Sequence, residues 1–293
     1  MKYVTLGNTG VEVSRIGLGG FAFGAVNRAR GWDPYTDEGR ADAVRVILHA
    51  VERGINYIDT AESYGDGHSE GIIGEALGRL DREELFIATK FHMDKGPDEI
   101  RASVRQSLRR LNCGHLDLVQ FHGGAYGPEA ARSIVEDGPA DALADLREEG
   151  VIRFVGATTS EAHSLLPLLR ADVLDVVQVR YNLIYQAAAH HLLNEARERG
   201  AGVVLMRPMT SGMLQWQANH LLPELAEGCD LYEVCLKFVL ADSRVHVAHV
   251  GMRWPEEVDR NVALVDRFEP AVDVAEMPRS TRGIYDYQDG ETT

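Results

Sequence analysis

Short apolar runs alternate with longer amphipathic stretches along this chain of 293 residues. The runs recur about every thirty residues, which is the length of one strand with its crossover helix. Such alternation predicts a parallel sheet with helices on both faces. The runs begin near Arg15, Asn56, Leu85, Leu116, Ile152, Leu174, Gly202 and Val245. Because eight strand–helix repeats can close into a barrel, we expect an α/β fold, a single (β/α)8 TIM barrel, rather than an open doubly wound sheet.

The ends of the expected helices carry the residues that usually stand there. Ser69 and Ser160 precede the second and fifth helical patterns, and we expect both to be N-caps. Proline stands at the start of three further helices, at Pro97, Pro139 and Pro255. The helices should therefore begin close to these five positions.

An N-terminal β-hairpin is expected before the barrel. Residues 3–6 and 11–14 are strand-like and flank the turn 7–10, which contains two glycines. No linker or change in composition divides the chain, so we expect one domain over 1–293. It would comprise a hairpin at 1–14, the barrel at 15–268 and a polar tail at 269–293. The tail would either cover the barrel mouth or be partly disordered.

Composition limits the function. The net charge of −15, with no basic cluster, argues against nucleic acid as a partner. No apolar run is long enough for a membrane span, and the N-terminus has no signal-peptide pattern. Cys113, Cys229 and Cys235 have neither metal-binding spacing nor a disulfide pattern. We therefore expect a cytoplasmic monomer or small homo-oligomer that acts on a small molecule and holds no metal.

Four polar residues stand where a barrel enzyme would place its active site. Asp59, Lys90 and His122 each end one of three successive apolar runs, and Tyr64 follows Asp59 in the glycine-rich turn 63–67. In a (β/α)8 barrel the C-terminal ends of the strands meet on one rim, which carries the catalytic residues. The four side chains should therefore lie together there. Taken singly, each has an ordinary structural explanation, but their joint order favours an active site.

These residues suit proton transfer to a carbonyl. A tyrosine titrates near ~10, and a neighbouring ammonium lowers that value. Lys90 can supply the charge, Asp59 can hold Lys90, and His122 can orient a substrate oxygen. Tyr64 would then be a general acid or base tuned toward neutral pH. No serine or cysteine nucleophile with a base is evident, so hydride from a reduced nicotinamide is the natural complement.

Residues 59–65, the strand end at 88–90 and the strand at 117–122 resemble the aldo-keto reductase superfamily. The resemblance extends from the hairpin to about Asn261. It implies a (β/α)8 barrel with NADPH extended across its C-terminal face. It also implies a catalytic tetrad of Asp59, Tyr64, Lys90 and His122, in which Tyr64 protonates the carbonyl oxygen as hydride arrives.

The resemblance also implies a set of cofactor contacts. Gln178 would hold the nicotinamide amide, Thr158 and Thr159 replace the family's Ser-Asn, and Met206 takes the place of the stacking aromatic residue. The residues after Met206 would bind the pyrophosphate. The full expected set is Gly20, Phe21, Asp59, Thr158, Thr159, Gln178, Met206, Arg207, Pro208, Met209, Ser211, Gly212, Gly251, Arg253 and Asn261.

The adenosine end of the site gives a mixed indication of cofactor preference. Arg253 precedes a helix that begins at Pro255, and it would bind a 2′-phosphate. Glu257 stands where many NADPH-specific relatives have a basic residue. We therefore expect NADP(H) as the cofactor and keep NAD(H) as a possibility.

Several other residues have two interpretations. The loop 23–34 is either a surface loop or a wall of the substrate pocket, with Phe21 and Trp32 near the carbonyl. His92 and Tyr126 are candidates for the pocket lining. His246 and His249, in the eighth strand, are expected to be structural. The Gly-x-Gly-x-x-Ala pattern at 17–22 is not expected to be a dinucleotide fingerprint, because no helix clearly follows it.

The main prediction is an NADP-dependent aldo-keto reductase that converts aldehydes or ketones to alcohols. A sugar or polyol dehydrogenase working oxidatively, with Tyr64 as base, is the second possibility. A cofactor-binding regulatory subunit is the third. The loops after the first and fourth barrel strands, together with the C-terminal tail, should set substrate specificity.

Overall fold

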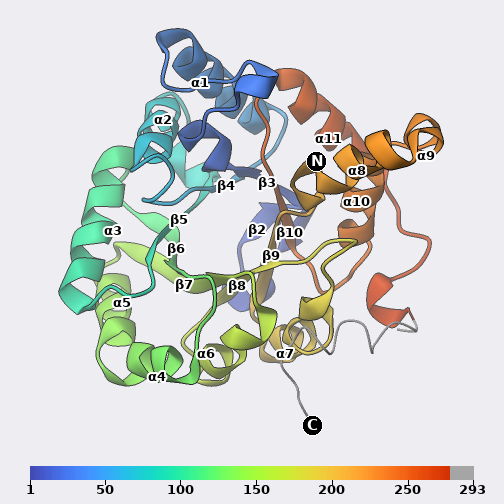
Figure 1. Ribbon diagram of the computed structural model, residues 1–293. Helices are drawn as coiled ribbons and strands as arrows, with labels where there is room; N and C mark the ends of the chain where they lie inside the picture. Colours follow the sequence, from blue (N-terminus) through green and yellow to red (C-terminus); the bar gives the residue numbers. More distant parts are fainter. Residues whose placement is uncertain (278–293) are drawn as a thin grey trace.

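The computed structural model describes residues 1–277, apart from the side chains of residues 225 and 226. Parallel strands form a closed barrel in the order β10-β3-β4-β5-β6-β7-β8-β9, which confirms the expected (β/α)8 fold (Figure 1). The barrel strands are β3 Ile16–Gly19, β4 Tyr57–Asp59, β5 Phe86–His92, β6 Leu116–His122, β7 Ile152–Thr159, β8 Val176–Arg180, β9 Gly202–Met206 and β10 Val247–Val250. What was expected of the tail beyond residue 277 lies outside the described residues.

Helices form an outer ring around the strands (Figure 1). They are α1 Asp37–Glu52, α2 His68–Leu77, α3 Pro97–Leu111, α4 Pro128–Glu136, α5 Pro139–Glu148, α6 Leu166–Arg170, α7 Leu192–Arg199, α8 Met213–Leu221, α9 Pro223–Gly228, α10 Leu231–Leu240 and α11 Pro255–Arg267. Helices such as α1, α3 and α11 bury the valine, isoleucine and leucine side chains of one face. Among these described helices, none is long and apolar enough to cross a membrane.

The three prolines stand at the first helical position, as expected. Both serine caps were wrong. Helix α2 begins after Gly67, whose φ of 85° lies in the left-handed region, and the Ser69 hydroxyl instead donates to the Gly20 carbonyl at 2.8 Å. Ser160 is followed by the 3-10 helix Ala162–Leu165, and α6 begins only at Leu166. Tertiary contacts and local turns therefore set these two helix starts.

The hairpin β1 Tyr3–Thr5 and β2 Glu12–Ser14 seals the N-terminal end of the barrel. Its Leu6 and Val13 are fully buried in one cluster with interior side chains of the barrel strands, among them Tyr57, Phe86 and Val247. Side chains alternate between the two faces of a strand. The residues two and four positions further along the barrel strands therefore point into the same interior, toward the opposite, C-terminal end.

Candidate active site

The barrel places Asp59, Lys90 and His122 inside its C-terminal end. Asp59 lies two residues after the interior residue Tyr57, and Lys90 and His122 follow the interior residues Ala88 and Leu118 at the same parity. Strand β5 pairs with β4 on one side and with β6 on the other, so the three side chains come from adjacent strands. Tyr64 joins them from the loop between β4 and α2. The structure thus gathers all four residues singled out in the sequence.

Lys90 is the centre of this group. Its Nζ donates to Asp59 Oδ1 at 2.5 Å and to the Thr60 carbonyl at 2.6 Å, and it lies 3.4 Å from the Tyr64 hydroxyl. Lys90 is 2% exposed and Asp59 is 3% exposed. Burial alone would lower the pKa of Lys90, but Asp59 and Tyr64 outweigh it and the net shift is upward. Lys90 is therefore a fixed ammonium beside the phenol.

His122 completes the group as a neutral imidazole. Burial, together with the positive charge of Lys90, lowers the pKa of His122 to about 4. Its ring meets the Tyr64 ring edge-on, with 5.8 Å between centroids, and its Nδ1 lies 3.4 Å from Ser63 Oγ. A neutral imidazole carries one N–H donor. His122 can therefore donate to an oxygen placed next to the Tyr64 hydroxyl.

The residues expected to hold a nicotinamide lie on β7, β8 and β9, the strands that follow β6 around the barrel. Gln178 is buried, and within residues 1–277 its Oε1 has no hydrogen-bond partner. Met206 is half-buried at the end of β9. Thr158 has the interior parity, whereas Thr159 turns its hydroxyl outward to the Gly124 carbonyl at 2.7 Å. An unpaired amide oxygen in a buried site suits a ligand with N–H donors.

The turn after β9 has an unusual backbone. Arg207, Thr210 and Ser211 have φ values of 56°, 56° and 55°, and Gly212 follows at 78°. Residues other than glycine pay a cost in this left-handed region, and such strain concentrates at ligand-binding segments. The Thr210 hydroxyl accepts from the Leu214 N–H at 3.1 Å and so supports the turn. These residues with positive φ lie in the segment that is expected to bind the pyrophosphate.

A compact charged group marks the expected adenosine end. Glu257 accepts the backbone N–H of Arg253 at 2.7 Å and the Arg30 guanidinium at 2.7 Å. Arg30 comes from the β3–α1 loop, and its guanidinium lies 4.8 Å from the Trp254 ring. Arg253 is half-buried, and its Nε has no partner among the described residues. Two cations thus flank one carboxylate at the start of α11.

The structure separates the two aromatic residues that one interpretation put in the substrate pocket. Phe21 is 61% exposed, and its ring meets the Tyr64 ring at 5.3 Å. Trp32 is only 2% exposed; its Nε1 donates to the Ala22 carbonyl and its ring packs against Trp254. Placing Trp32 at the carbonyl was therefore wrong, because the loop folds back on itself and buries the indole. Phe21 alone stands at the mouth.

The two other lining candidates also differ. Tyr126 is buried, and its hydroxyl donates to the carbonyls of Phe121 and Thr158, so it supports the strand ends and does not line a pocket. The side chain of His92 is exposed and lies 3.4 Å from Asp94. It remains available at the rim.

Sequence reasoning missed two residues that touch the tetrad. Gln120 Nε2 lies 3.4 Å from Asp59 Oδ2, and His249 Nδ1 lies 3.7 Å from Asp59 Oδ1. The period-two alternation carried this signal, because Gln120 lies between Leu118 and His122, and His249 follows Val247 at interior parity. His249, expected to be structural, thus lies against Asp59 of the tetrad.

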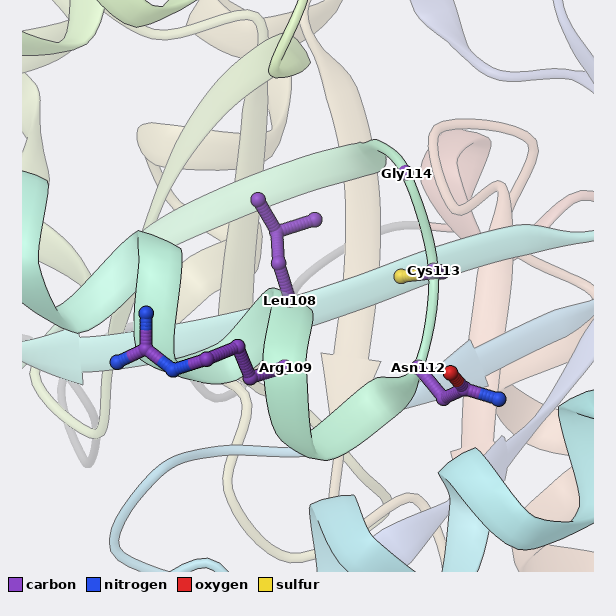
Figure 2. A pocket seen from close by; sticks show the side chains of 5 residues that line it. All are labelled: Leu108, Arg109, Asn112, Cys113 and Gly114. Atoms are coloured by element: carbon purple, nitrogen blue, oxygen red, sulfur yellow. The ribbon is translucent and has the colours of Figure 1, made fainter.

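The surface hollow in Figure 2 lies elsewhere. Leu108, Arg109, Asn112, Cys113 and Gly114 line it, at the end of α3 and in the turn before β6. That turn leads into the N-terminal end of a barrel strand, opposite the rim that carries Tyr64. The hollow has no part in the tetrad.

Comparisons with known proteins agree with this fold. A model described as the aldo/keto reductase family matches residues 15–277. An NADH-specific methylglyoxal reductase of Escherichia coli is 32% identical over 73% of this chain and 69% of its own. L-galactose dehydrogenase of Arabidopsis thaliana is 29% identical over 90% and 88%. The holo form of an aldo-keto reductase from Bacillus halodurans superposes with a TM-score of 0.75, at 27% identity over 93% of both chains.

Proposed function

The chain belongs to the aldo/keto reductase family, and we propose that it reduces aldehydes or ketones to alcohols with a nicotinamide cofactor and Tyr64 as proton donor. One observation carries the proposal: a buried ammonium, Lys90, held by Asp59 and 3.4 Å from the Tyr64 hydroxyl. A cation at that distance stabilises the phenolate that remains once the proton has left. The family membership supplies the reaction class.

The chain's residues divide the work of the reduction. The Tyr64 hydroxyl gives its proton to the carbonyl oxygen, and Lys90 stabilises the negative charge that remains on the phenol. The neutral His122 donates a hydrogen bond to the same oxygen and orients the carbonyl. Phe21, which is exposed beside Tyr64, offers an apolar edge to the substrate. A reduced nicotinamide, when bound, supplies the hydride.

The interior residues fit a nicotinamide. Gln178 Oε1 is buried without a partner among the described residues and can accept from a carboxamide N–H. Thr158 adds a hydroxyl on the same interior face, and Met206 adds a polarizable apolar surface at the end of β9. The strained turn from Arg207 to Gly212 would hold the pyrophosphate.

We propose NADP(H) as the preferred cofactor, with NAD(H) also accepted. Arg30 neutralises Glu257, which leaves Arg253 as a second cation for a 2′-phosphate. The carboxylate could instead accept a ribose hydroxyl, and the relative from Escherichia coli is an NADH-specific enzyme. Rates of oxidation measured with NADPH and with NADH decide the preference.

The opposite direction is a second candidate. A relative that matches 90% of this chain is L-galactose dehydrogenase, and the same site run in reverse would use Tyr64 as the base. Reduction of NADP and NAD in the presence of a sugar and polyol panel tests this candidate.

Because Cys113, Cys229 and Cys235 are all free, we also propose a reducing location, the cytoplasm. We propose in addition that the protein is a monomer or small homo-oligomer that acts on small molecules.

Tyr64→Phe tests the proposed acid. We expect kcat on a reactive aldehyde to fall by about a hundredfold or more, the usual effect of removing a general acid. The dissociation constant for NADPH, measured by fluorescence titration, should be nearly unchanged because the ring remains. Tyr185→Phe, outside the tetrad, is the matched control and should keep its kcat. Full turnover by the Tyr64 variant would refute the assignment.

A further inference from the structure

His249 lies inside the barrel between two residues of the candidate site. Its Nδ1 is 2.8 Å from Gln178 Nε2 on β8 and 3.7 Å from Asp59 Oδ1 on β4. The residue is 7% exposed. One imidazole therefore touches both the carboxylate that anchors Lys90 and the amide expected to meet the cofactor. The reduction as described assigns no task to this ring.

The neighbouring strand leaves space for the ring. A Cβ added to Gly17, on β3, would stand 2.5 Å from His249 Cδ2 and 3.0 Å from its Nε2. The Tyr57 ring packs against the imidazole with 4.8 Å between centroids. These contacts leave the imidazole little freedom to turn, so its Nδ1 stays directed at Gln178.

The protonation state follows from the surroundings of the ring. Burial lowers the pKa of His249 to about 4; Asp59 opposes that shift and Lys90 adds to it. The ionisable groups around the ring are Asp59, Lys90 and Tyr57. The imidazole is thus neutral at pH 7, with one accepting and one donating nitrogen. In the observed orientation of the Gln178 amide, Nδ1 is the acceptor, and the proton is then on Nε2, which has no partner within residues 1–277.

The tautomer fixes the orientation of the Gln178 amide. While Nδ1 accepts from Nε2 of Gln178, the amide presents its Oε1, which has no partner within residues 1–277. If Nδ1 carried the proton, the amide would have to turn over and present its N–H2 group instead. A bound carboxamide would then meet a donor where it needs an acceptor.

We propose that His249 is a positioning residue, which holds Gln178 so that its Oε1 remains available to a nicotinamide carboxamide. The inference rests on the proposed function. Because His249 lies on β10, this strand would contribute to cofactor recognition through Gln178. Asparagine at 249 could replace Nδ1 with an amide acceptor, whereas leucine could not.

Nucleotide titration tests the proposal without turnover. We expect His249→Leu to weaken binding of NADPH about tenfold, the effect of losing one hydrogen bond and its orientation. ADP-ribose phosphorylated at the 2′ position lacks the nicotinamide, and its affinity should stay within about twofold. His249→Asn should recover most of the NADPH affinity. Equal loss of both ligands, or no loss of either, would overturn the proposal.

A matched variant and a double mutant separate positioning from packing. His246→Leu removes a half-buried histidine three residues before His249, whose Nδ1 accepts the Val203 N–H, and this variant should bind NADPH normally. In a Gln178→Leu background, His249→Leu should add almost no further loss, because the two residues act as one unit. Full additivity would contradict action through Gln178.

The wild-type protein gives an independent readout if the leucine variant fails to fold. Nitrogen-15 NMR of the histidine rings should show the Nε2–H tautomer of His249 around neutral pH, and an Nδ1–H tautomer would overturn the inference. Failure of the proposed function looks different. The wild-type protein would then bind no nicotinamide nucleotide, while the NMR signal would still report the contact between His249 and Gln178.

Discussion

At the scale of single residues, contacts distinguish residues of the candidate site from structural residues better than a shifted pKa does. Burial lowers the pKa of His122, His246 and His249 to about 4 in each case. Yet His122 stands beside Tyr64, His249 holds Gln178, and His246 accepts a backbone N–H of Val203 at the other end of the strand. A perturbed pKa alone would have placed all three at the site.

A prediction at this scale concerns the role of Arg253 in nucleotide binding. Arg253→Met should weaken NADPH binding about tenfold or more, because a charge-assisted contact to the 2′-phosphate is lost, and should leave NADH binding almost unchanged. Fluorescence titration of both nucleotides measures the ratio. Arg260→Met, which removes an exposed cation of α11 paired with Asp230, is the control. Equal weakening of the two nucleotides would remove Arg253 as the phosphate partner.

At the scale of elements, the strands act through alternation and close approach. Interior parity carries Asp59, Lys90 and His122 on β4, β5 and β6 and the expected cofactor residues on β7, β8 and β9. Strand β3 has no side chain at Gly17, and the His249 ring on β10 occupies the space that a side chain there would fill. Two adjacent strands thus share one volume, and a side chain on one excludes a ring on the other.

Gly17→Ala tests that shared volume. The added methyl would meet the His249 ring at 2.5 Å, so we expect a loss of about 1–3 kcal/mol in the free energy of unfolding, as in other overpacked cores. Urea denaturation measures it. Gly114→Ala, at a position with no atom near the added Cβ, should cost much less. A second change, His249→Ala, should restore part of the stability; no recovery would mean that the strain lies elsewhere.

At the scale of the whole molecule, histidines buried in their neutral form make the free energy of unfolding depend on pH. The three histidines with a pKa of about 4 in the fold bind a proton near pH 6.5 when unfolded. Between these values the unfolded chain holds more protons, so acidification favours unfolding. Above the unfolded value their contribution is constant. Carboxylates with a lowered pKa, such as Glu62, act in the same direction at lower pH.

We therefore expect the free energy of unfolding to fall as pH drops from about 6.5 toward 5, by up to about 1.4 kcal/mol per pH unit for each histidine. From about pH 7.5 to 6.5 these groups should contribute little. Urea titrations across this range measure the slope. His246→Asn should reduce it, and His220→Asn, at an exposed position, should not. An unchanged slope in the His246 variant would mean that this ring titrates normally in the fold.

The sequence predicted the strands well because each is a compact apolar run between turn signals. It predicted helix starts well where proline fixed them, and wrongly at Ser69 and Ser160, where left-handed glycine or a 3-10 turn took over. Loops were the weakest part. Helix α4, in the loop after β6, was missed although Pro128 stands at its start. The inward fold of Trp32 has no local signal, because its contacts with Ala22 and Trp254 create it.

The sequence by itself determined the repeat, the barrel and the four residues at successive strand ends, because periodicity and order along the chain are local properties. Only the tertiary structure decided which groups touch. Closure of the barrel places β10 beside β3. It also brings His249 of β10 close to Gln178 on β8 and to Asp59 on β4, a residue far away in the sequence. Contacts of that kind depend on curvature and register across the whole sheet, which a linear pattern does not contain.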